Sequence, residues 1–182
     1  MRKYYYFLAS LPSLSITCEN SLAPDNFLNL AKYYCHPNDF ASVSRALLTF
    51  NDGKSDFLFL RKWLNWEKSL RYALALARKE NVNFKYELPE APENLISIDA
   101  AQKALNEKNP FIAETIIDKA RWTFIEELES GNFFNLNNLF AYYLKLQLLE
   151  RRRAMTEEYG ASAFEALYEK QKTAFADVAY NA

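Results

Sequence analysis

The stretch from Phe57 to Glu80 constrains the fold more than any other part of the chain, because it contains neither Gly nor Pro. On a helix at about 100° per residue, its apolar residues fall on one line, at alternating spacings of four and three. This seam consists of Phe59, Trp63, Trp66, Leu70, Ala73 and Ala77. Such a pattern is typical of a helix that packs lengthwise against other helices. The stretch therefore predicts the central helix of an all-helical domain.

A second stretch, residues 136–155, is apolar on nearly every side. Between Leu139 and Leu149 only Lys145 and Gln147 interrupt the apolar run. A helix that is apolar all round is enclosed by protein on most sides. We therefore expect this helix to be buried more completely than its neighbours.

A third helix is predicted to begin at Pro110, which suits a first helical turn, and to end at Gly131. Its seam consists of Ala113, Ile117, Ala120, Phe124 and Leu128. We expect the first seam to pack against this helix or against the stretch that is apolar all round. The predicted structural core is Trp63, Trp66, Leu70, Phe124 and Leu144.

The rest of the chain predicts shorter elements. Residues 3–11 fit either a strand or a short buried helix, since a short apolar run does not distinguish the two. Their aromatic side chains need a partner surface, so we expect this segment to lie against the helical body. The other predicted helices cover residues 24–35, a segment from Pro37, residues 100–108 and the residues after a break at Gly160. Ser97 or Asp99 is the expected N-cap of the helix over residues 100–108.

Together these patterns predict an all-α fold, a bundle of about six or seven helices in a single domain covering residues 1–182. Residues 87–99 contain two prolines and four acids but no basic residue. An alternative is therefore that they link two lobes, residues 1–86 and 100–182. The two long stretches also resemble each other, with an aromatic first half and a basic second half. That likeness fits an internal duplication, or two helices obeying the same packing rules.

Composition limits the possible functions. The net charge of −1 argues against a nucleic-acid partner, and no run of apolar residues approaches the ~20 needed to span a bilayer. With only three glycines, the chain contains no glycine-rich phosphate loop, and it contains no HExxH motif. We therefore expect no cofactor and no small-molecule substrate. Cys18 and Cys35 suggest no disulfide framework, which favours a reducing cytoplasm.

Neither a metal site nor an enzyme active site is expected. His36 is the only histidine, and zinc sites need three or four ligands. We place His36 at a helix boundary, although a small helical enzyme that uses His36 or a carboxylate is an alternative. Adjacent acids such as Glu126 and Glu127 point about 100° apart on a helix, so they do not share a site.

Charged residues are the best candidates for a partner interface. Arg151, Arg152 and Arg153 form the densest charge cluster, which fits either an acidic partner or a basic last turn that complements the helix dipole. Glu67, Arg71 and Arg78 lie beside the first seam. They fit an ion pair that fixes the register of the bundle, or part of a polar contact surface. The predicted interface residues are Arg71, Arg78, Arg151, Arg152 and Arg153.

Three segments carry a resemblance to a known family. They are YYYFLASLP at residues 4–12, the run from Trp66 to Arg78, and YLKLQLLERR at residues 143–152. They resemble a short bacterial family that occurs with V-type ATPases and is similar to the stalk-to-ring socket protein of these enzymes. The likeness covers most of the chain, although this chain is considerably shorter than the usual socket protein.

The resemblance implies an all-helical socket that sits on the membrane rotor ring and receives the foot of the central stalk. It therefore implies a non-catalytic coupling subunit that is cytoplasmic and peripheral at the inner face of the membrane. Its partners would be the central-stalk subunits and the rotor ring. The alternative is a helical protein-interaction adaptor unrelated to ATPases.

Overall fold

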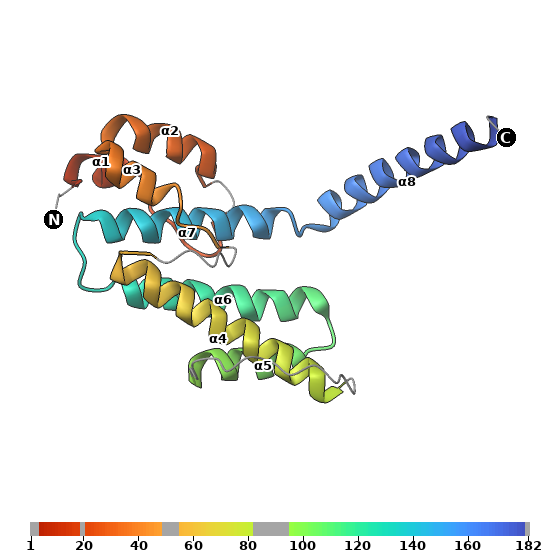
Figure 1. Ribbon diagram of the computed structural model, residues 1–182, viewed down its shortest axis with the longest axis horizontal. Helices are drawn as coiled ribbons and strands as arrows, with labels where there is room; N and C mark the ends of the chain where they lie inside the picture. Colours follow the sequence, from red (N-terminus) through yellow and green to blue (C-terminus); the bar gives the residue numbers. More distant parts are fainter. Residues whose placement is uncertain (1–3, 19–20, 49–54, 82–94, 181–182) are drawn as a thin grey trace. The chain divides into compact units, whose positions relative to one another are not determined.

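The computed structural model describes residues 4–18, 21–48, 55–81 and 95–180. In these residues the protein is all-α, as the sequence predicted, with eight helices and no strand (Figure 1). The chain divides into two units, Met1–Leu149 and Glu150–Ala182, which we call the first and second units and describe separately. The helices are α1 (Tyr5–Ser10), α2 (Pro24–Tyr34), α3 (Pro37–Val43), α4 (Leu58–Asn81), α5 (Leu95–Asn106), α6 (Pro110–Glu129), α7 (Leu136–Arg153) and α8 (Glu157–Tyr180).

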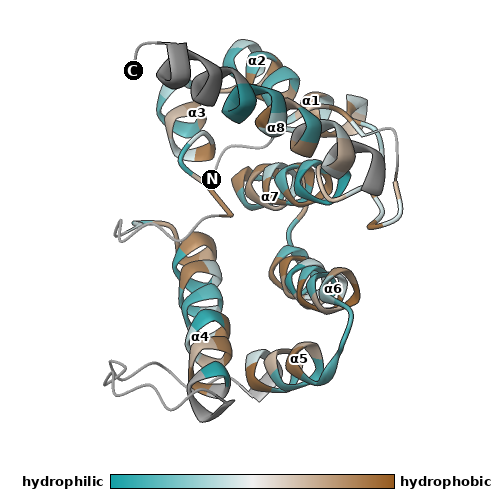
Figure 2. Cartoon of the chain, turned by 90° about the vertical axis from the view of Figure 1, so that its right-hand side faces the viewer, coloured by the Kyte–Doolittle hydropathy of each residue, from teal (hydrophilic) through white to brown (hydrophobic). Residues whose placement is uncertain are grey.

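The helix at the centre of the first unit is α7. It lies between a layer of α1, α2 and α3 and a layer of α4, α5 and α6 (Figures 1 and 2). Between Leu139 and Leu149 only Tyr142 and Gln147 are not fully buried. The sequence analysis assigned the central place to the stretch that forms α4, and this was wrong. A seam on one face needs cover on one side only, whereas a helix that is apolar all round needs cover on both.

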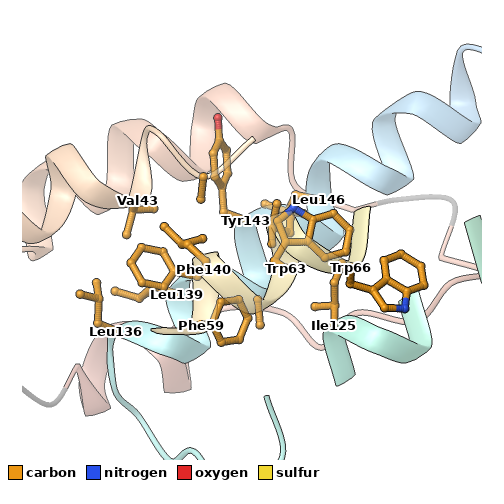
Figure 3. Packing of buried hydrophobic residues seen from close by; sticks show 14 of the residues in the cluster. Val43, Phe59, Trp63, Trp66, Ile125, Leu136, Leu139, Phe140, Tyr143 and Leu146 are labelled. Atoms are coloured by element: carbon orange, nitrogen blue, oxygen red, sulfur yellow. The ribbon is translucent and has the colours of Figure 1, made fainter. Parts of the chain in front are cut away.

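The core forms where α4 and α6 meet α7, and Figure 3 shows its side chains close together. Trp66 stacks on Phe124 with 4.7 Å between ring centroids, and Trp63 lies 5.9 Å from Trp66. Of the expected core residues, Trp63, Trp66, Leu70 and Leu144 are buried, and Phe124 is partly buried against the same cluster. Aromatic stacking of this kind stabilises a core beyond the effect of the buried area alone.

The N-terminal segment forms a short helix, α1, rather than a strand. Phe7 is buried against the core, where its ring stacks on Phe27 and on Tyr34. Just before the helix, the Tyr4 N–H donates to the carbonyl of Phe134, and the Tyr4 hydroxyl donates to the Asp39 carboxylate. The segment is therefore tied to the body by both aromatic and polar contacts.

Helix α5 begins at Leu95, so the predicted start at residue 100 was wrong. Ser97 is buried inside the helix, and Asp99 lies within it and pairs with Lys103. Neither residue is an N-cap. Ile98 packs against the core, so the apolar stripe of the helix begins earlier than the acids and prolines of residues 87–99 suggested. Residues 87–94 of the expected linker lie outside the described residues.

The boundary between units also differs from the two-lobe alternative. Helices α4 and α5, on either side of the acidic segment, contact each other within the first unit. The predicted break at Gly160 was wrong as well, since Gly160 lies inside α8 and its N–H donates to the Thr156 carbonyl at 2.9 Å. The break falls earlier, at residues 154–156. A glycine in an exposed helix costs only about 1 kcal/mol, which does not end the helix.

Candidate functional site

A buried ionic cluster joins α4 to α6. Its centre is Glu67, whose side chain is 0% exposed. The Arg121 Nη2 donates to Glu67 Oε1 at 2.9 Å, and the Arg121 Nε donates to Oε2 at 3.1 Å. The Arg121 Nη1 donates to Asp118 Oδ1 at 3.0 Å, and the Arg71 Nε donates to Glu67 Oε1 at 2.8 Å. Both carboxylate oxygens of Glu67 therefore face a guanidinium.

Local spacing brings the members of the cluster together. Glu67 and Arg71 are four residues apart on α4, and Asp118 and Arg121 are three apart on α6, so each pair lies on one helix face. Burial by itself would lower the pKa of Arg121. Its hydrogen bonds and charge interactions with Glu67 and Asp118 outweigh that effect, and the pKa is raised. The cluster therefore stays charged, and it orients α4 against α6 by a two-pronged contact.

Sequence reasoning anticipated the Glu67–Arg71 pair but missed Arg121 and Asp118. The predicted seam of α6 covers only part of its buried surface, which also includes Trp122 and Ile125. An acid and an arginine three residues apart, next to the seam residue Ile117, were the available signal. Because such pairs are common on exposed helix faces, the pattern alone does not indicate burial.

The two predicted interface arginines of α4 have different environments. The Arg71 side chain is 47% exposed, and its Nε is held by Glu67. Arg78 is exposed, and it pairs with no acid among the residues that the structure describes. Arg71 therefore contributes to the structural cluster, while its outer part and Arg78 remain accessible to a partner.

Arg151, Arg152 and Arg153 form the last turn of α7 and are half-buried. Cations at a helix C-terminus interact favourably with its partial negative charge. Arg151 and Arg153 also interact with other groups of the chain. These three arginines open the second unit, whereas Arg71 and Arg78 belong to the first.

A second ionic cluster explains the lysine in the middle of α7. The Lys145 Nζ donates to Glu129 Oε2 at 2.6 Å and lies 5.3 Å from the centroid of the Trp122 ring. The Trp122 Nε1 donates to Glu126 Oε1 at 2.7 Å. Lys145 is nearly buried, so its charge is compensated by an acid and an aromatic face.

A pocket of about 290 Å³ opens beside Lys145, between α1 with its following segment and the turn from α6 to α7. Its polar groups are engaged with one another. The Asn138 Nδ2 donates to Glu129 Oε1 at 3.4 Å and to the Asn132 carbonyl at 3.3 Å. The Tyr142 hydroxyl donates to the Pro12 carbonyl at 3.0 Å. These bonds fasten the N-terminal segment to α7.

Exposed tyrosines stand on the outer layer of the first unit. Tyr6 of α1 is 87% exposed and Tyr33 of α2 is 83% exposed. Their neighbours Tyr5 and Tyr34 are about half-exposed and contact Phe134 and Phe7, respectively. Tyrosine is enriched at the energetic centres of protein interfaces, so this layer is a second candidate contact surface.

His36 lies at a helix boundary, as predicted, where its Nδ1 accepts from the Asn38 N–H at 3.4 Å and so caps α3. Among the described residues, no group of three or more His, Cys, Asp or Glu side chains is placed to hold a metal ion. Within the same residues, no helix combines the length and the apolar character that crossing a membrane requires.

The fold and these sites define a helical protein whose first unit is held together by two ionic clusters. The profile of a family described as "Protein of unknown function (DUF2764)" matches residues 75–174, more than half of the 182 residues. The chain belongs to this family. The matched region runs from the second half of α4 into α8 and includes Asp118, Arg121 and the three arginines at residues 151–153. No curated protein matched the chain, and no solved structure did.

Proposed function

We propose that the protein is a non-catalytic coupling subunit of a V-type rotary ATPase that links the central stalk to the membrane rotor ring. The proposal starts from the resemblance of three segments to the family similar to the socket protein of V-type ATPases. One of them, residues 143–152, belongs to α7, which lies at the centre of the first unit and ends in three arginines. This is the observation that carries the proposal, because it joins a buried, braced core to a charged helix end.

Mechanical coupling requires a body that does not yield under load. Helix α4 is braced to α6 through Glu67 and Arg121, and α7 is braced to α6 through Lys145 and Glu129. Gln147 of α7 adds a third tie, since its Nε2 donates to the Ala46 carbonyl at 2.8 Å. Charge-assisted bonds in a poorly hydrated interior are stronger than those at the surface. They therefore support a role in transmitting force.

In this role the protein acts passively, at the cytoplasmic face of the membrane. One surface docks on the polar loops of the ring subunits, and another holds the foot of the stalk. Arg71, Arg78 and residues 151–153 steer and orient the docking. Because these contacts are electrostatic, we expect the association to weaken as salt is raised.

The decisive experiment deletes the gene in the native host and isolates the ATPase complex. The proposal expects that head and ring no longer co-purify, or that hydrolysis continues without ion pumping. Normal pumping by an intact complex that lacks the protein would refute it.

A charge-reversal variant tests the proposed contact residues. Replacing Arg151, Arg152 and Arg153 together by Glu should uncouple hydrolysis from pumping while circular dichroism stays unchanged. Because two of the three arginines have partners within the chain, the single variant Arg152→Glu should be tested as well. Reversal of Lys103 and Lys108, which are exposed on and after α5, is the matched control and should have no effect.

The exposed tyrosines favour a second candidate function, a helical adaptor unrelated to ATPases. Tyr6 and Tyr33 offer large side chains at low entropic cost to a partner that binds the outer layer. Replacement of both by Ser should abolish such an interaction and leave ATPase coupling intact. If the double variant instead impairs coupling, the tyrosines serve the rotary complex and the adaptor role is refuted.

A further inference from the structure

The outward face of α4 carries a stripe of residues opposite its buried seam. The stripe consists of Arg61, Asn65, Lys68, Tyr72 and Leu76, at successive spacings of three or four residues. Arg61, Asn65 and Lys68 are exposed, and Leu76 is 40% exposed. Because α4 extends over 24 residues, the stripe forms a long, straight contact line rather than a local spot.

Within the part of the chain that the structure describes, the positive charge of this face is uncompensated. Arg61, Lys62, Lys68 and Arg78 are all exposed, and none pairs with an acid among the described residues. Glu67 does not offset them, because it is buried and already faces Arg71 and Arg121. A chain with a net charge of −1 therefore presents a strongly basic helix face.

Apolar groups lie within the same face. Leu58 at the start of α4 is 58% exposed, and Leu76 and Tyr72 occupy its second half. Cations predominate in the first half, where Arg61 and Lys68 are two helical turns apart. Figure 2 shows both hydrophilic and hydrophobic residues along α4. A partner that fits this pattern carries acids along one part and apolar residues along the other.

We propose that the outward face of α4 is a docking surface for an acidic amphipathic helix of a partner protein. Two packed helices interlock side chains at spacings of three and four, which is the spacing of this stripe. Its acidic groups would meet Arg61 and Lys68, while its apolar groups would cover Tyr72 and Leu76. The inference stands whether or not the partner belongs to an ATPase.

A partner helix explains the face better than a nucleic acid or a membrane does. Nucleic-acid binding relies on cations throughout the contact, whereas Tyr72 and Leu76 occupy half of the line. A membrane-bound helix needs a continuous apolar face to insert, and here Arg61, Asn65 and Lys68 interrupt it. An acidic amphipathic helix satisfies both halves at once.

The test measures binding of a fluorescein-labelled synthetic helix to the whole protein by fluorescence anisotropy. The probe has Leu on one face and Glu beside it in one half, and a control peptide has Lys in place of Glu. Vesicles of phosphatidylglycerol and phosphatidylcholine and a short DNA duplex are tested in parallel. We expect binding of the Glu peptide alone, weakening as salt rises from about 50 mM to about 500 mM.

Site-directed variants locate the contact. The double variant Arg61→Glu/Lys68→Glu should weaken the Glu peptide about tenfold or more, because it places like charges opposite each other. The neutral variant Arg61→Gln/Lys68→Gln should give a smaller loss. The matched control Lys108→Glu/Lys119→Glu reverses two exposed lysines elsewhere and should change the affinity by less than about twofold.

Three results would overturn the proposal. They are no binding of the Glu peptide, equal weakening by the control reversal, and binding of vesicles or DNA that is lost on reversal of Arg61 and Lys68 while the peptide does not bind. Circular dichroism of each variant shows that the bundle is intact. Because the assay uses the isolated protein, its outcome is independent of the gene-deletion experiment on the ATPase.

Discussion

Replacement of Arg121 by Met should destabilise the first unit by about 3–5 kcal/mol, which is the range for breaking one side of a buried ion pair. The Arg121 side chain is 11% exposed, and its partners Glu67 and Asp118 are 0% and 1% exposed. Met fills much of the same space, so the loss comes from the charges rather than from a cavity. Arg71 still contacts Glu67 in the variant, which keeps the loss below the sum of the three lost bonds.

Two further variants separate charge from geometry. Arg121→Lys keeps the charge but loses the planar fork that donates to both carboxylates, so we expect an intermediate loss of about 2 kcal/mol. Arg71→Met removes a cation that is 47% exposed and should cost only about 0.3–1 kcal/mol. The exposed pair of Lys103 and Asp99 gives a control, since Lys103→Met should cost no more than about 0.5 kcal/mol.

The assay is urea denaturation followed by tryptophan fluorescence. All three tryptophans, Trp63, Trp66 and Trp122, lie in the first unit, so the signal reports on the unit that contains the cluster. The reasoning is refuted if Arg121→Met costs less than about 1 kcal/mol, or if Arg71→Met costs as much as Arg121→Met. Either result would mean that the carboxylates gain water or other partners at little cost.

Three other predictions follow from the packing and the polar contacts. Trp66→Ala should cost about 3–5 kcal/mol in reversible denaturation, since Trp66 is 2% exposed and stacks on Phe124; a loss under about 1 kcal/mol would contradict its enclosure. Gln147→Leu should cost about 1–3 kcal/mol by leaving two backbone groups of the segment after α3 without their partner, and a neutral effect would show that water replaces it. Burial and the hydrogen bond to Asp39 raise the pKa of Tyr4 from 10.0 to about 12. The unfolded chain therefore loses this proton first, and stability should fall as the pH rises from about 10 to about 12. Tyr4→Phe should lessen that fall, as measured by urea denaturation across this pH range, and an unchanged pH profile would contradict the assignment.

The sequence by itself determined which segments are helical and which of their faces are buried. The spacing of Trp63, Trp66 and Leu70 predicted the buried face of α4, and the apolar run from Leu139 to Leu149 predicted an enclosed helix. Both patterns are informative because the period of an α-helix places residues three and four apart on one side. The charge and aromatic content indicated candidate interface residues, but it did not indicate which of them are accessible.

Only the tertiary structure decided how these helices meet. It placed α7 rather than α4 at the centre, and it paired Glu67 with Arg121, which lies 54 residues further along the chain. It also extended helices through positions that local rules mark as boundaries, Ser97 in α5 and Gly160 in α8. A sequence pattern shows that a face needs cover, but the choice of partner depends on the docking of helices that are distant in the chain. The same docking removes Glu67 from solvent and leaves Arg61 and Lys68 exposed, so the interaction surface inferred for α4 follows from packing rather than from composition.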